Sequence, residues 1–330
     1  MKRSLAVYSL VGAALAVSVV AAQQAPAPPG VANAAPPPAA AIAPLHIYLR
    51  AGMKTHGPGQ HDYPQFLADW STVLTQHGAV VDGSYHFPTA QELQGVDVIV
   101  SYKGDSGYMT ESEKMVLEDF LRRGGGIVAF HDTICAEDPA WFSTIYGGAK
   151  KHGETNFTLD ANVPYTVVDK TNPIMEGFPD NLSLTDESFY LMTWADSPKI
   201  NVLATTKIDD TPSARAGTGH VGEVVPQMWT YERTILGLGA QPYRAFVWMQ
   251  GHEYKNFTNP AIEKMILRGI AWVGKRPIDF LENGRPAGRF GGGGRQGRQG
   301  GRAGAPGAGG RRGGGAGAGA PAAPAPGGRQ

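Results

Sequence analysis

Histidine and carboxylate side chains recur in this sequence where strands are expected to end. The histidines are His56, His61, His131, His152 and His252, and the acids beside them are Asp62, Asp132, Asp186 and Glu187. Imidazole nitrogens and carboxylate oxygens bind zinc in proteins, and the same groups transfer protons in catalysis. The sequence therefore predicts a polar site that holds a metal ion, performs acid/base chemistry, or does both.

The predicted metal ligands centre on one loop rich in glycine and proline. This loop contains His56, His61 and Asp62, and its backbone can turn sharply enough to bring both imidazoles to one point. With His152 and His252, these residues form the expected ligand set of a divalent metal. Zinc suits their mixed nitrogen and oxygen donors best. The alternative is a solvated surface loop.

His131 and Asp132 follow the run Gly-Gly-Gly-Ile-Val-Ala-Phe (124–130). A strand-to-helix turn at this point would place the side chain of His131 over the edge of a sheet. We therefore predict His131 and Asp132 as catalytic residues, with Asp186 or Glu187 as a base or as the orienter of a histidine. The alternatives are a packed His131 and a solvated acid pair.

Aromatic residues near these segments could stack on a sugar ring. The predicted substrate-binding residues are Trp229, Tyr231, Tyr190 and Tyr254. The alternative is that they pack in the core, as strand aromatics commonly do. Cys135 is the only cysteine, so no intrachain disulfide forms. A buried, inert thiol is the expectation for it, and a Cys135 hydrolase is an alternative.

The elements that position these residues follow a strand–helix–strand rhythm. Apolar runs predict strands at 45–50, 79–85, 97–102 and 127–130, with helices after the first and third. This alternation is typical of a parallel sheet. Shorter β segments at 155–160, 164–168, 200–206 and 224–231 predict an antiparallel extension, before a last core strand at 244–249 and a helix from Pro260 through Trp272. A nucleotide cofactor is not expected, because no G-x-G-x-x-G or Walker A motif occurs.

The two ends of the chain differ in composition from its middle. Residues 1–22 resemble a secretory signal peptide, with Lys2 and Arg3 before an apolar run and a small-residue cleavage site. Residues 23–43 form an Ala/Pro-rich linker, 44–277 a folded domain, and 278–330 a disordered Gly/Arg/Ala/Pro-rich tail. We expect an exported protein, periplasmic or extracellular, without a transmembrane segment in the mature chain.

The zero net charge conceals an acidic domain. From Arg285 onward the tail has eight arginines and no acid, and the signal has two basic residues. Of the 29 basic residues, 19 therefore remain against 29 acidic ones, which is a net charge of −10. An acidic domain of this kind does not bind nucleic acid, and its cationic tail suits contact with anionic surfaces.

Several quoted segments together resemble the ThuA-like (trehalose utilisation) family of the class I glutamine amidotransferase-like superfamily. They are residues 56–64, 124–131, 185–190, 229–232, 250–252 and 259–272. The resemblance implies a flavodoxin-like three-layer α/β/α sandwich and a role in carbohydrate metabolism beside a sugar oxidoreductase. It does not imply glutaminase activity, which requires a cysteine where this chain has His131.

These observations favour an exported enzyme that acts on a small sugar or a keto-glycoside. Hydrolysis, elimination or isomerisation beside a carbonyl would use the histidines, the carboxylates and a divalent metal. A non-catalytic carbohydrate-binding or scaffolding module is the alternative, because the same groups can hold a glycan without turning it over.

Overall fold

The computed structural model describes residues 42–152, 157–216 and 219–283. The predicted signal peptide, nearly all of the linker and most of the predicted tail lie outside these residues. The unit described below begins at Leu45. Among the described helices, none has the length and apolar character needed to cross a membrane.

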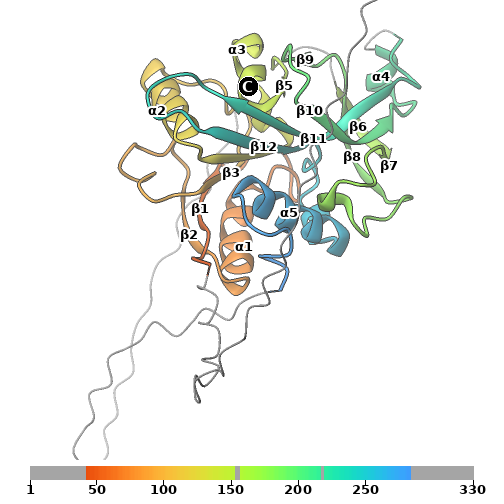
Figure 1. Cartoon of the computed structure of the whole chain (residues 1–330). Coiled ribbons are helices and arrows are strands. Elements are labelled where there is room, and N and C mark those ends of the chain that lie inside the picture. The colour runs from red at the N-terminus through yellow and green to blue at the C-terminus, as the bar shows by residue number, and fades with distance from the viewer. Residues whose placement is uncertain (1–41, 153–156, 217–218, 284–330) are drawn as a thin grey trace, which may run out of the picture. The chain divides into compact units, whose positions relative to one another are not determined.

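A mixed eight-stranded sheet forms the centre of the domain (Figure 1). Five strands are parallel and follow the spatial order β2 (Val80–Ser84), β1 (His46–Ala51), β3 (Val98–Tyr102), β4 (Gly126–Phe130) and β12 (Pro242–Trp248). The sheet then continues in antiparallel fashion through β11 (Val224–Thr234), β10 (Ile200–Lys207) and β7 (Thr166–Val167). The predicted α/β fold with an antiparallel extension is confirmed.

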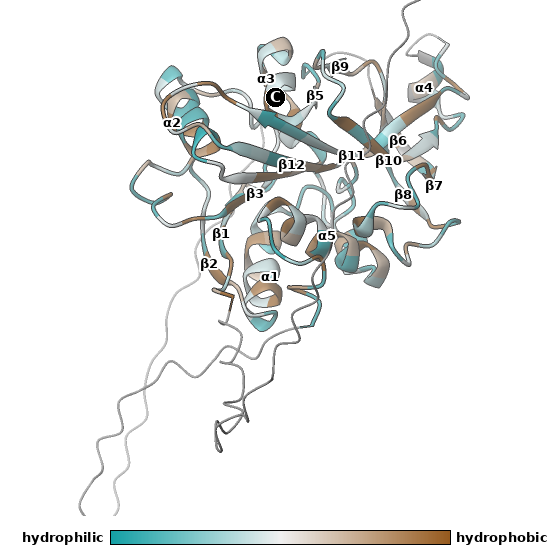
Figure 2. Ribbon diagram, viewed as in Figure 1, coloured by the Kyte–Doolittle hydropathy of each residue, from teal (hydrophilic) through white to brown (hydrophobic). Residues whose placement is uncertain are grey.

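Helices cover both faces of the parallel strands, which gives the three predicted layers. Helices α1 (Tyr63–Gln76) and α5 (Pro260–Val273) pack on one face, with Phe66, Trp70 and Ile266 in the core. Helices α2 (Glu111–Arg122) and α3 (Pro139–Tyr146) pack on the other. Figure 2 shows that hydrophobic and hydrophilic residues alternate along the ribbons of α1 and α2, which is the pattern of amphipathic helices.

The chain between β4 and β10 builds smaller elements that the sequence pattern predicts less well. Strands β5 (Gly148–Ala149) and β9 (Thr193–Trp194) form one pair, and β6 (Phe157–Pro164) and β8 (Ser183–Phe189) form another. Helix α4 (Pro212–Ala216) follows β10. The predicted break between the segments 155–160 and 164–168 is wrong, because β6 runs through residues 161–163. Asp186 and Glu187 lie inside β8 rather than at a strand end.

Local signals explain where the helices begin. Thr110 and Glu113 form the predicted capping box of α2, and Asn259 caps α5 by accepting from the backbone N–H of Ala261. The packed chain continues past the predicted boundary at residue 277. Leu281 is fully buried in the α1/α5 core and Arg268 pairs with Glu282, so residues 278–283 belong to the domain.

Candidate metal centre

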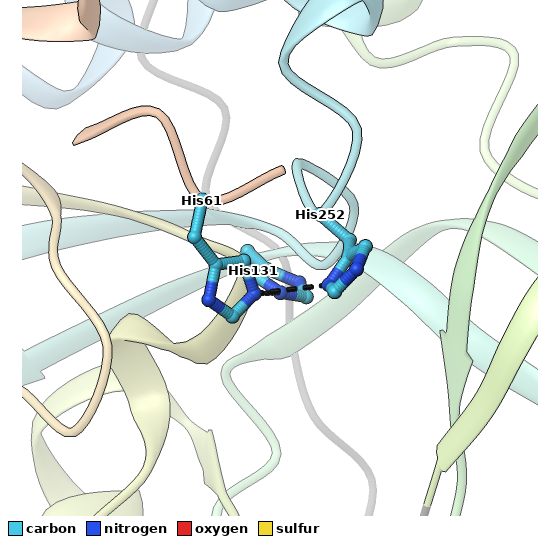
Figure 3. Close-up of side chains that lie close together, drawn as sticks. All are labelled: His61, His131 and His252. Carbon is cyan, nitrogen blue, oxygen red and sulfur yellow. Dashed lines mark hydrogen bonds between the residues drawn. The ribbon is translucent and has the colours of Figure 1, made fainter. Parts of the chain in front are cut away.

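Three histidines from distant parts of the chain meet at one point. His61, His131 and His252 each offer a ring nitrogen, and these atoms lie within 4.8 Å of one another. His61 Nε2 is 2.8 Å from His131 Nε2 and 3.0 Å from His252 Nδ1. Figure 3 shows the three rings pointing toward one another, and all three residues are buried. We call these residues the histidine trio.

The topology of the sheet explains how the trio assembles. β4 and β12 are neighbouring parallel strands, so His131 and the segment that carries His252 emerge at the same end of the sheet. The loop after β1 then docks on the segment after β12. The His61 N–H donates to the His252 carbonyl at 3.0 Å, and Gln60 forms a bridge with Glu253.

Two members of the trio have strained backbones. His61 has φ 46° and His131 has φ 53°, values in the left-handed region that non-glycine residues rarely adopt. Such a conformation costs roughly 1–3 kcal/mol and clusters at functional sites. The predicted sharp turn after the strand is present at His131, where the 3-10 helix His131–Ile134 begins.

Two members of the trio, His61 and His131, are held as neutral imidazoles. Burial lowers the pKa of His61 to about 2 and that of His131 to about 4, and the neighbouring histidines add to the effect. His131 Nδ1 faces the Met249 carbonyl at 3.3 Å, and a carbonyl only accepts, so the proton is assigned to Nδ1. The lone pair of His131 Nε2 is then directed at His61.

Two carboxylates flank the trio. Asp132 Oδ2 is 3.7 Å from His131 Nε2 and 4.0 Å from His61 Nε2. On the other side, Glu187 contacts His131 at 3.6 Å and His252 at 3.2 Å. Negative charge next to neutral nitrogen donors favours a cation at this point.

Lys150, which sequence reasoning missed, fixes the charge of Asp132. Its ammonium lies 2.9 Å from Asp132 Oδ1 and 4.2 Å from the centre of the Phe189 ring, and the residue is buried. Burial alone would raise the pKa of Asp132, but His131 and Lys150 hold it well below its ordinary value. Asp132 is therefore ionised at neutral pH.

Asp186 organises the backbone around His252. Its carboxylate accepts hydrogen bonds from the N–H groups of Gly251, His252 and Glu253 and from the Asn256 amide. Burial raises the pKa of Asp186 to about 7, against the lowering effect of these donors. The residue therefore positions the segment after β12, and the catalytic role predicted for it stays a prediction.

A pocket of about 380 Å³ opens beside the trio, a size that suits a small ligand. His61 and Asp132 form the part of its wall next to the trio. The other lining residues are Gly52, Met53, Thr55, His56, Tyr63, Tyr85, Lys103, Gly104, Asp105 and His152. A molecule in this pocket would therefore reach one imidazole of the trio and one ionised carboxylate.

The remaining predicted ligands lie outside the trio. His56 is exposed, and its ring centre is 4.0 Å from that of His61. Asp62 pairs with Lys54 at 3.1 Å. His152 is exposed and pairs with Asp105 at 2.9 Å. Among these, His56 and His152 line the pocket, so they can contact a ligand there.

The four predicted sugar-binding aromatics do not line this pocket. Trp229 and Tyr231 are buried beneath α3, where the Trp229 indole donates to the Tyr146 carbonyl. Tyr190 is buried and stacks on His220, and the Tyr254 hydroxyl donates to Asp69 of α1. These side chains pack within the domain because neighbouring elements cover their strands and loops, which favours the alternative that they serve the core. Tyr63 and Tyr85 line the pocket instead.

Cys135 does not have the environment of a nucleophile. It is fully buried, and burial together with the charge of Asp132 raises the pKa of its thiol well above the ordinary value. A reactive cysteine needs the opposite shift. The expectation of an inert thiol agrees with this environment, and the alternative of a Cys135 hydrolase has no support in it.

Comparisons with known proteins agree with the fold. A ThuA-like protein from Parabacteroides merdae ATCC 43184 has a TM-score of 0.52 and 18% identity, over 70% of this chain and 90% of that chain. A ThuA-like protein from Bacteroides uniformis ATCC 8492 has a TM-score of 0.49 and 18% identity, over 71% and 93%. No curated protein matches the sequence. The sequence model for trehalose utilisation proteins (ThuA) matches residues 54–273, and the chain therefore belongs to the ThuA family, which indicates a carbohydrate-related role.

Proposed function

We propose that this protein is a divalent-metal-dependent enzyme that acts on a small sugar or a keto-glycoside. His61, His131 and His252 would hold the metal, and zinc fits a set of three imidazoles best. The sugar class comes from the family. The predicted signal peptide supports a location outside the cytoplasm. A sugar oxidoreductase would supply the substrate.

The convergence of three buried ring nitrogens carries this proposal. A proton on His61 Nε2 can form a hydrogen bond to only one of the two neighbouring nitrogens, His131 Nε2 or His252 Nδ1. A metal cation can accept the lone pairs of all three nitrogens. Zinc–nitrogen bonds of about 2.0–2.1 Å separate tetrahedral ligands by roughly 3.3 Å, close to the spacing found here. The outer nitrogens of two trio members are oriented as metal ligands require. Thr55 contacts His61 Nδ1, and the Met249 carbonyl faces His131 Nδ1.

Within the pocket, the residues of this chain would bind the sugar and move its protons. A bound divalent cation supplies polarisation of a carbonyl or hydroxyl oxygen. Asp132 would orient the sugar groups next to that oxygen or act as a further metal ligand. Its low pKa makes it a weak base. His56 reaches the pocket beside His61, and imidazole is the side chain that most often transfers protons near neutral pH. We assign proton transfer to His56.

Product analysis on a sugar panel tests this proposal. The full chain is incubated with disaccharides and their keto derivatives, with added zinc or manganese or with EDTA, and products are followed by NMR. We expect turnover that requires metal, is lost in His61→Ala and is retained in His220→Ala, a histidine outside the site. Turnover that survives both EDTA and His61→Ala would refute the metal-dependent mechanism. Saturable binding without turnover would favour the carbohydrate-binding module.

A further inference from the structure

A second cavity opens at the opposite end of the parallel strands from the histidine trio. It has a volume of about 390 Å³ and is lined by Asn172, Lys199, Asn201, Thr230, Glu232 and Trp272. None of these residues lines the pocket beside His61. Strand β12 connects the two regions, because Arg244 near its start pairs with Glu232, whereas His252 follows its end.

Trp272 gives this cavity an aromatic wall that is fixed in place. It lies near the end of α5 and packs against the α1/α5 core. The Arg244 guanidinium lies 4.7 Å from the ring centre and also donates to the Trp272 carbonyl at 3.0 Å. A rigid indole of this kind offers apolar contact area at little cost in conformational entropy.

The rest of the lining offers hydrogen-bonding groups with spare capacity. Thr230 and Asn201 are cross-strand partners on β11 and β10. The Asn201 amide donates to Asp169 at 2.8 Å, which leaves its oxygen as an acceptor. Within the described chain, neither the Thr230 hydroxyl nor the Lys199 ammonium has a hydrogen-bond partner. Glu232 contacts Arg244 only at 3.7 Å.

We propose that this cavity is a second carbohydrate site, which binds an uncharged saccharide. One aromatic wall beside mixed donors and acceptors suits a sugar, which presents C–H faces and hydroxyls together. Lys199 and Glu232 balance each other in charge, so the lining favours neither an anion nor a cation. The site does not depend on the proposed metal chemistry. It also gives a role to the motif ending at Trp272, which the histidine trio does not use.

Fluorine NMR of the full chain labelled with 5-fluorotryptophan tests this site directly. The chain has six tryptophans, and the Trp272→Phe variant assigns the Trp272 resonance. No tryptophan lines the pocket beside His61, so binding there leaves this resonance in place. We expect trehalose or maltose to shift the Trp272 signal saturably, and glucuronate to leave it unchanged.

Substitutions in the cavity sharpen the result. Thr230→Val and Asn201→Ala each remove one hydrogen bond and should weaken binding roughly 5- to 10-fold. Lys207 lies on β10, as Asn201 does, but outside the cavity, so the Lys207→Ala variant should bind the saccharide as the wild type does. The proposal is overturned if no uncharged saccharide shifts the Trp272 resonance. It is also overturned if Asn201→Ala leaves the affinity for the saccharide unchanged. A shift with glucuronate alone overturns the assignment of an uncharged ligand.

Discussion

Acid should destabilise the metal-free protein through its buried neutral histidines. In the folded state the pKa of His131 is about 4, whereas an unfolded histidine has a pKa of about 6.5. The folded state thus binds fewer protons, and stability is lost as pH falls through about 6.5. Between pH 7 and pH 5 the unfolded histidine becomes almost fully protonated while His131 stays mostly neutral. At 1.36 kcal/mol per pKa unit this costs about 2 kcal/mol.

The His131→Gln variant isolates this contribution. Urea denaturation with EDTA at pH 7 and at pH 5 gives the free energy of unfolding of each protein. We expect the loss on acidification to be about 2 kcal/mol smaller in His131→Gln than in the wild type. The comparison cancels other titrations, such as that of Asp186. The exposed His152 provides the control, and His152→Gln should lose nearly as much as the wild type. Equal losses in His131→Gln and the wild type would refute a neutral, buried His131.

Three further substitutions test other parts of the structure. Asp186→Asn places an amide donor opposite the N–H groups after β12, so it should destabilise the fold by about 3 kcal/mol and weaken metal binding 10- to 100-fold; an unchanged urea midpoint would contradict the positioning role. Cys135→Ala should cost about 1 kcal/mol of stability and leave turnover intact, and loss of turnover in a folded variant would restore the thiol as a candidate nucleophile. Leu281→Ala should cost roughly 3 kcal/mol in urea denaturation, and no change would mean that residues 278–283 do not pack on the domain.

The sequence predicts the sheet and two of the three trio histidines for the same physical reason. Apolar runs mark the buried strands β4 and β12, and the residues after them must lie at one end of the sheet. The position of His61 was harder to predict, because it depends on a left-handed backbone and on docking of one loop against another. Lys150 follows a two-residue strand that leaves no periodic signal.

The aromatic residues show a second limit of sequence reasoning. Alternation in β11 indicates that Trp229 and Tyr231 share one face, but not that α3 covers that face. Asp186 and Glu187 were predicted near a strand end, although they lie within β8. Both contact the segment after β12, which is more than 60 residues away in the chain, and Glu187 also contacts His131 after β4.

Metal stoichiometry tests the central claim most directly. The full chain is stripped with EDTA, dialysed against zinc and measured by elemental analysis, beside the variants His61→Ala, His252→Ala and His152→Ala. We predict about one zinc per chain in the wild type and in His152→Ala, and loss of that zinc in both trio variants. Absence of zinc from the wild type, or full retention in His61→Ala, would contradict a metal centre formed by His61, His131 and His252.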